Sequence, residues 1–279
     1  MSTQPQIRNL RFDIRHDTPE AKATVPRYWH GGRRSVTAFF DNLSIFFPEG
    51  ERFFVRSVRA YDRRAKDETL REAVRAFCGQ EGIHSREHVR YNEMLAAEGY
   101  PAHAMEARVV RLLRLVTRVT PRRSQLAVTC ALEHFTALMG ELILSDPRML
   151  EGADPTMAAL WRWHAAEENE HKAVAFDVFL AAGGTYAERV ITMVVASVVF
   201  WAKVLEHQAR MMKSDGTLWS LSEWTALAQF LFVQPGGLRA IVPRYFAYYR
   251  PGFHPNDVDS SGVLEAWKRA HESASAAAA

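Results

Sequence analysis

Residues 163–179 read WHAAEENEHKAVAFDVF, and this stretch decides the fold. Glu168 precedes His171 by three positions, and His164 precedes Glu168 by four. Side chains three or four residues apart project from one side of a helix, so all three can face a common point. Leu160 begins this stripe, and the apolar residues after His171 continue it. The pattern predicts a helix with buried carboxylate and imidazole groups.

A second stretch, FCGQEGIHSREHVRYNEML at residues 77–95, repeats the motif with Glu81 and His84. One Glu-x-x-His is weak because glutamate-rich helices produce it by chance, but two of them far apart in one chain are specific. Helical bundles with two metal ions use two such helices and one glutamate from each of two others. His88 follows His84 by one turn, and its role is open between metal ligand, partner of a ligand and ordinary packing.

The first single glutamate is Glu133, in ALEHFTA at residues 131–137. It lies midway along an otherwise apolar helix, where an unpaired charge is costly. Its neighbours one and two turns away are small, which predicts room for a metal ion, dioxygen or substrate: Thr129, Thr136, Ala137 and Gly140.

The second single glutamate is Glu49 or Glu51, in FFPEGERFFVRSVRAY at residues 46–61. Glu51 is followed at helical spacing by apolar residues, which places it on the core side. Glu49 directly follows Pro48 and suits the start of a helix, where a carboxylate is favourable. We therefore expect Glu51 to be the fourth carboxylate.

Helical periodicity covers nearly the whole chain after Gly31, and the prediction is an all-α, ferritin-like four-helix bundle with additional C-terminal helices. A helix from residue 35 should stop at Pro48 and restart at Glu49, and Asp67 and Asp154 should cap later helices. The expected organisation is an extended arm, a metal-binding bundle, C-terminal helices of the same domain and a disordered tail: residues 1–34, 35–183, 184–272 and 273–279.

Composition excludes several classes of protein. A formal charge of +3 with dispersed arginines does not predict nucleic-acid binding, which needs a concentrated basic surface. Cys78 and Cys130 form no paired motif and predict buried thiols of a reducing compartment. Because no apolar leader opens the chain, a cytoplasmic protein is expected. The apolar run 190–205 falls short of the roughly 20 residues of a membrane span and predicts a buried helix or a homodimer face, with contact to a membrane surface as the alternative.

The order Glu, Glu-x-x-His, Glu, Glu-x-x-His resembles the ferritin-like di-iron oxygenase superfamily. The additional histidine in His-x-x-x-Glu-x-x-His is similar to the arylamine N-oxygenases, which use a third histidine. The resemblance implies two bound iron ions, with manganese as an alternative. Carried over by position, the ligands are Glu51, Glu81, His84, Glu133, His164, Glu168 and His171.

The four quoted stretches also resemble a bacterial family described only as predicted metal-dependent hydrolases, over most of residues 10–250. The function expected first is a di-metal oxidoreductase that hydroxylates or N-oxygenates a small apolar substrate with dioxygen and an unknown electron donor. Glu133 and His88 are its expected catalytic residues. Aromatic residues beside the motifs should line an apolar pocket next to Glu133.

Two alternatives remain. His84-Ser-Arg-Glu-His88 fits the H-x-x-E-H of inverted zinc peptidases, in which two histidines hold zinc and Glu87 serves as general base. That interpretation predicts a zinc hydrolase, and it leaves Glu51, Glu81 and Glu133 unexplained. A non-catalytic metal-binding protein is the other alternative. The polar residues beside the stripes are expected at the surface or in ordinary packing: Glu87, Glu167, Glu170 and His134.

Overall fold

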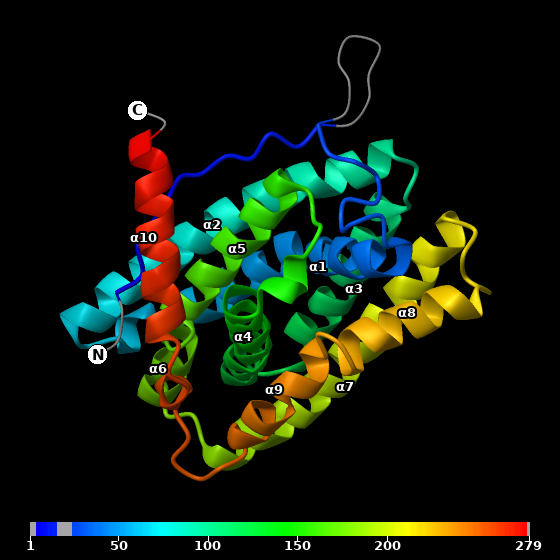
Figure 1. The fold of residues 1–279 in the computed structure, drawn as a ribbon. Coiled ribbons are helices and arrows are strands. Elements are labelled where there is room, and N and C mark those ends of the chain that lie inside the picture. The colour runs from blue at the N-terminus through cyan, green and yellow to red at the C-terminus, as the bar shows by residue number, and fades with distance from the viewer. Residues whose placement is uncertain (1–3, 16–23, 278–279) are drawn as a thin grey trace.

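The computed structural model describes residues 4–15 and 24–277 of the chain. Regular structure in these residues is helical, apart from one isolated antiparallel bridge between His30 and Ala153 (Figure 1). The expected all-α class is confirmed. The α-helices have the following bounds: α1 Arg34–Arg59, α2 Glu68–Ala97, α3 Ala102–Val119, α4 Arg122–Ser145, α5 Pro155–His171, α6 Val174–Ala181, α7 Tyr186–Ser214, α8 Leu221–Phe232, α9 Gly237–Ala247 and α10 Ser261–Ala277.

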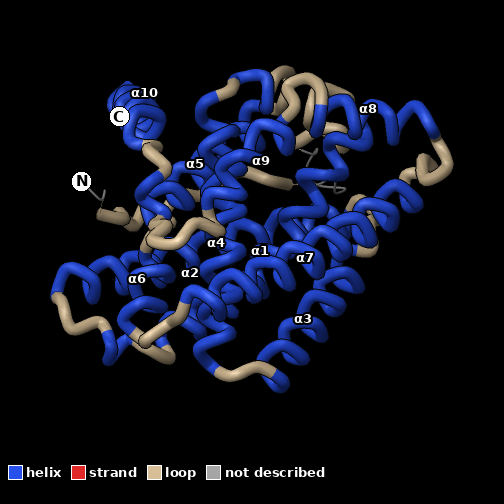
Figure 2. The backbone as a smooth tube through the Cα atoms, turned by 90° about the horizontal axis from the view of Figure 1, so that it is seen from below, coloured by secondary structure: helices blue, strands red, loops and turns tan. Residues whose placement is uncertain are grey.

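Four helices form a closed ring of contacts: α1 packs on α2, α2 on α5, α5 on α4, and α4 on α1. All four carry predicted metal ligands, so the ring brings distant parts of the chain to one core. Helix α7 packs against α4 and α1, α3 packs against α1, and α9 packs against α4 (Figure 2). The proposed division of the chain into an arm, a bundle and C-terminal helices stays a prediction.

The predicted helix starts at Asp67 and Asp154 are confirmed. The Asp67 carboxylate accepts a hydrogen bond from the amide of Leu70, and Asp154 accepts from those of Thr156 and Met157. These bonds satisfy amide groups that the first turn of a helix leaves without a partner.

Pro48 does not end the first helix, so this prediction was wrong. Helix α1 runs through Pro48, whose missing N–H leaves the Ser44 carbonyl without its helical donor. The Asn92 side chain of α2 supplies a replacement, since its Nδ2 donates to the Ser44 carbonyl at 3.3 Å. Packing between α1 and α2 therefore compensates for the proline.

Two other boundaries differ from the sequence prediction. The helix expected to continue to Gly183 breaks between His171 and Val174, where the buried Lys172 side chain donates to the Val258 carbonyl and to Ser260 Oγ. The tail expected to be disordered from residue 273 continues α10 as far as Ala277, and alanine is the residue with the highest helix propensity.

Residues 4–15 form an extended segment that lies against α2 and α5. The Phe12 amide donates to Glu87 of α2, and Arg8 binds Glu170 of α5. Gly79 permits this approach, because a Cβ there would lie 2.4 Å from the Ile7 side chain. The segment thus covers one side of the bundle beside the predicted ligands.

Two helices, α4 and α7, are long and apolar enough to cross a membrane by length and composition alone. The apolar window of α4 is 72% buried, as a core helix requires, whereas that of α7 is only 22% buried. The apolar run of 190–205 lies within α7, and most of it is not covered by this chain. The predicted cytoplasmic location is not tested by this finding.

Candidate metal centre

The structure brings all seven predicted ligand side chains together inside the ring of helices. None is more than 3% exposed. The side chains come from α1, α2, α4 and α5 in the order in which they were predicted: Glu51, Glu81, His84, Glu133, His164, Glu168 and His171.

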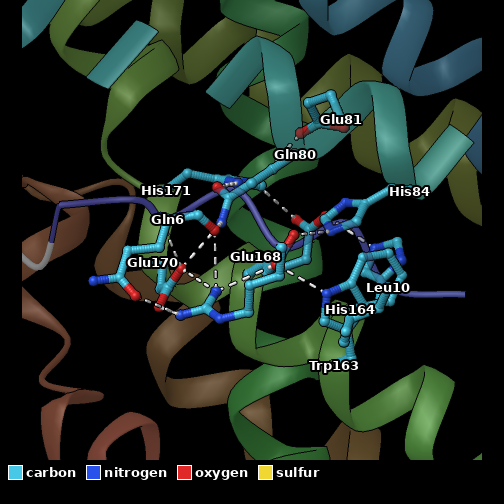
Figure 3. A network of polar contacts seen from close by, with 12 residues as sticks. Gln6, Leu10, Gln80, Glu81, His84, Trp163, His164, Glu168, Glu170 and His171 are labelled. Carbon is cyan, nitrogen blue, oxygen red and sulfur yellow. Dashed lines mark hydrogen bonds and ion pairs between the residues drawn. The ribbon is translucent and has the colours of Figure 1, made fainter. Parts of the chain in front are cut away.

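Glu168 lies at the middle of this cluster. Its Oε1 is 2.9 Å from Nε2 of His164 and 3.6 Å from Nδ1 of His84, and its Oε2 is 3.6 Å from Nε2 of His171 (Figure 3). The same nitrogen of His171 lies 3.3 Å from Glu81 and 3.4 Å from Glu133. These separations match ligand atoms that share an ion at about 2 Å.

More than one set of potential ligands is present among the described residues. Four groups of three residues each offer ligand atoms that all lie within 4.8 Å of one another. The mixture of carboxylates and imidazoles suits iron, manganese or zinc. The groups are Glu51–His88–His164, His84–His164–Glu168, Glu51–Glu81–His84 and Glu81–Glu168–His171.

The carboxylates of Glu51, Glu81 and Glu133 are buried without a hydrogen bond to either oxygen among the described residues. Burial, followed by repulsion from the neighbouring carboxylates, raises the pKa of all three well above the ordinary value. The pKa of Glu168 is instead held well below its ordinary value, because His171 and His164 outweigh the effect of its burial. Buried acids without partners are destabilising, and a cation would satisfy them. The residues therefore fit a metal centre.

Each predicted histidine ligand uses its other ring nitrogen for a hydrogen bond outside the cluster. Nε2 of His84 lies 3.0 Å from Glu167, and Nδ1 of His171 lies 3.0 Å from Gln80 (Figure 3). Nδ1 of His164 lies 2.8 Å from Nε2 of His88. Such outer bonds fix the orientation and tautomer of metal-binding imidazoles. The inward nitrogens are thereby left to face the carboxylates.

Residues 6–259 match the sequence model of a family described as "Predicted metal-dependent hydrolase". The chain belongs to this family. No curated protein and no solved structure matches the chain. The family is metal-dependent by its description, and in this member of the predicted metal-dependent hydrolase family the buried cluster is the candidate for the metal.

A chain of hydrogen bonds determines how this family member presents His164. Glu106 accepts from Asn92 Nδ2 at 2.8 Å, which turns Asn92 Oδ1 toward Ser44. Ser44 Oγ donates to that oxygen at 2.8 Å and lies 2.9 Å from Nδ1 of His88. Because the serine hydrogen is already used, Nδ1 of His88 must carry a proton and donate to Ser44.

The remaining proton positions follow from this direction. Burial, together with the nearby His164, lowers the pKa of His88 well below its ordinary value, so His88 carries one proton at neutral pH. Its Nε2 accepts from Nδ1 of His164, so Nε2 is the His164 nitrogen that faces the cluster, 2.9 Å from Glu168. Of the three roles left open for His88, the geometry favours that of a partner that orients a ligand.

Ser44→Ala should weaken metal binding about tenfold, because His88 would lose the acceptor that fixes its tautomer. Ser57→Ala is the matched control: Ser57 is also buried on α1, and its Oγ bonds Thr129 outside this chain of hydrogen bonds. Calorimetric titration of metal into the metal-free proteins measures the affinity of both variants. Equal loss of affinity in the two would contradict the role given to Ser44.

Sequence reasoning missed several partners of the ligands. Glu167 and Glu170, expected at the surface or in packing, are buried and both bind Arg8. Burial raises the pKa of Glu167 to about 7, whereas Arg8 outweighs burial and lowers that of Glu170. Gln80 joins Glu170 to His171. In the sequence, Gln80, Glu167 and Glu170 are marked only by standing next to predicted ligands.

The structure does not assemble the zinc-peptidase arrangement. Glu87 is fully buried, and its carboxylate accepts from Arg86, Arg90 and the amide of Phe12. Among the described residues, no group of potential ligands contains both His84 and His88, the two zinc ligands that this arrangement requires. Glu87 is therefore held by positive charges and is not placed as a general base. His134 is buried outside the cluster and packs against Tyr248.

An apolar cavity of about 110 Å³ adjoins the cluster between α1, α3, α4 and α7. The ligand on its wall is Glu51, whereas the sequence led us to expect Glu133 there. Thr136 lines the cavity as expected, but Gly140 serves another purpose: a Cβ there would lie 2.9 Å from the Ala165 carbonyl of α5. The small residue at position 140 allows close packing of two helices and leaves no space for a substrate.

Proposed function

We propose that this chain is a metal-dependent enzyme whose seven clustered side chains hold two ions. The observation that carries the proposal is the set of buried carboxylate oxygens without hydrogen bonds, facing imidazole nitrogens that are free of other partners. Burial of these groups without partners destabilises the fold, and the free energy of binding an ion would compensate for it. One ion would draw mainly on His84, His164 and Glu168, and the other on Glu81, Glu168 and His171.

Hydrolysis is the reaction that we propose first, and the family description supports it. Bound ions would supply polarisation of a carbonyl or phosphoryl group and acidification of water. The cavity beside Glu51 has a volume of about 110 Å³, somewhat less than the engineered cavity of about 150 Å³ that binds benzene. It would therefore hold the apolar part of a small substrate. Thr136 and Lys203 are the polar side chains on its wall besides Glu51, and they would orient a polar end.

Oxygenation by a ferritin-like di-iron centre is the second candidate. Two observations favour it: four carboxylates surround the centre, and the cavity that reaches Glu51 is lined almost wholly by apolar side chains. Such a cavity would exclude water from a reactive oxidant. The order of the ligands along the chain resembles that superfamily, and the electron donor and dioxygen would be its further reactants.

Metal analysis of protein purified without added metal tests the shared proposal, with about two ions per chain as the expected result. Zinc or manganese, together with metal-dependent cleavage of chromogenic esters or phosphoesters, would support the hydrolase. Iron, with an optical change when the reduced protein meets air, would support the oxygenase. Folded protein that takes up no transition metal would overturn both.

A further inference from the structure

The face formed by α3, α7 and the α8–α9 pair exposes many large apolar side chains. On α7 they recur three, four and seven residues apart, which places them along one stripe of the helix. Monomeric soluble proteins rarely expose continuous apolar surface of this kind unless it binds something. We call the following residues the apolar face: Leu115, Val119, Ile191, Val194, Val195, Val198, Leu205, Phe232 and Val242, each between 45% and 66% exposed.

The parts of the apolar face are continuous with one another. Residues of α3 and α7 line the two sides of the cavity that reaches Glu51, and an ion pair joins Arg108 of α3 to Glu206 of α7. Leu205, Phe232 and Val242 line one groove between α7, α8 and α9. In Figure 2, α7 lies between α3 and α9.

The charge beside the apolar face is positive. Arg111, Arg114 and Arg118 of α3 are exposed and make no ion pair or hydrogen bond to the described part of the chain. The acidic side chains of α7 are already neutralised, Glu188 by Arg123 and Glu206 by Arg108, Lys203 and Arg210. Exposed apolar side chains flanked by unpaired arginines are typical of helices that lie on anionic lipid.

We propose that the apolar face binds the surface of a membrane containing anionic lipids, with α7 lying in the plane of the interface. Helix α7 is fastened along the bundle: Asn42 donates to the Val204 carbonyl and Gln208 to the Ser35 carbonyl. These bonds hold α7 beside the protein instead of across a bilayer. A second copy fits less well, because its own unpaired arginines would border the shared interface.

The apolar face also suggests the class of substrate. This inference rests on the proposed function. The cavity beside Glu51 lies between α3 and α7, whose outer sides form the apolar face. A small apolar compound dissolved in lipid would therefore reach the protein at the two helices that wall the cavity. We infer that such lipid-dissolved compounds are the substrates.

Sedimentation with vesicles tests the surface. The metal-loaded protein should bind vesicles of phosphatidylcholine with one-third phosphatidylglycerol, and bind less as salt increases. The triple variant R111Q/R114Q/R118Q should bind at least tenfold more weakly, since each arginine near a charged surface contributes about fivefold. V195E/V198E should lose binding. R63Q/R64Q/K66Q, an equal charge change on the α1–α2 connection, should bind as the unaltered protein does.

Binding that is absent, or unchanged in both face variants, would overturn the proposal. The proposal would also be overturned if the unaltered protein formed a stable dimer and did not bind vesicles, and V195E/V198E converted that dimer to a monomer. Circular dichroism excludes unfolding as a cause of either result. Because the Glu168→Gln variant should still bind vesicles, failure of the metal centre and failure of the membrane surface are separable.

Discussion

Glu168→Gln is expected to leave no more than one metal ion per chain and to reduce activity at least a hundredfold. Glu168 lies between His84, His164 and His171, so it belongs to both proposed ion sites. Loss of a residue that only orients a ligand costs ten- to a hundredfold, and loss of a shared ligand should cost more. Metal analysis and turnover under the same conditions measure the two effects.

Glu49→Gln is the control for this variant. Glu49 is paired with Arg52, and its side chain is 27% exposed outside the cluster, so metal content and activity should not change. Glu51→Gln, two residues further along α1, should lose metal. A Glu168→Gln protein that retained two ions would contradict the proposed arrangement of the centre.

Glu81→Gln is expected to raise the stability of the metal-free protein while reducing the stabilisation that metal provides. Glu81 is buried beside Glu133 and Glu168, and burial and repulsion from these acids raise its pKa. A neutral amide removes both that repulsion and the cost of protonating a buried acid near neutral pH, with a gain of roughly 1–3 kcal/mol in the free energy of unfolding. Thermal unfolding with and without metal measures both effects.

In the unaltered protein, metal at a hundred times its dissociation constant should add about 2.7 kcal/mol, or roughly 5–10 °C in midpoint. The Glu81→Gln variant should show a smaller metal-dependent shift from a higher starting midpoint. Glu141→Gln is the control: Glu141 is also buried, but it is paired with Arg244 outside the cluster. A metal-free Glu81→Gln protein less stable than the unaltered one would show that this carboxylate is structural.

The cluster of candidate ligands could be predicted because each of its residues belongs to a local pattern. Glu168 and His171 lie three residues apart on an apolar stripe, and helix geometry alone places them on one side. Glu133 stood out because an acid in an apolar helix needs a partner. Burial of Glu51 beside the cluster, with Glu49 paired at the surface, agrees with the choice made from neighbouring apolar residues.

The partners of the ligands could not be predicted in the same way. Ser44, Asn92 and Arg8 touch the site through contacts between segments far apart in the sequence, and no local period marks them. Pro48 was interpreted as the end of a helix because local rules make it a breaker. Only the neighbouring helix α2 could supply the Asn92 donor that keeps α1 continuous.

The sequence by itself determined the all-α class, most helix boundaries and the carboxylates and histidines that gather in the core, because these follow from helical periodicity and the cost of burying charge. Tertiary structure alone decided which nitrogen of each histidine faces the centre and that Glu51 borders the apolar cavity. It also left one face of α7 uncovered. These features depend on side chains that meet across helices, and their hydrogen bonds and cavities exist only once the helices have packed.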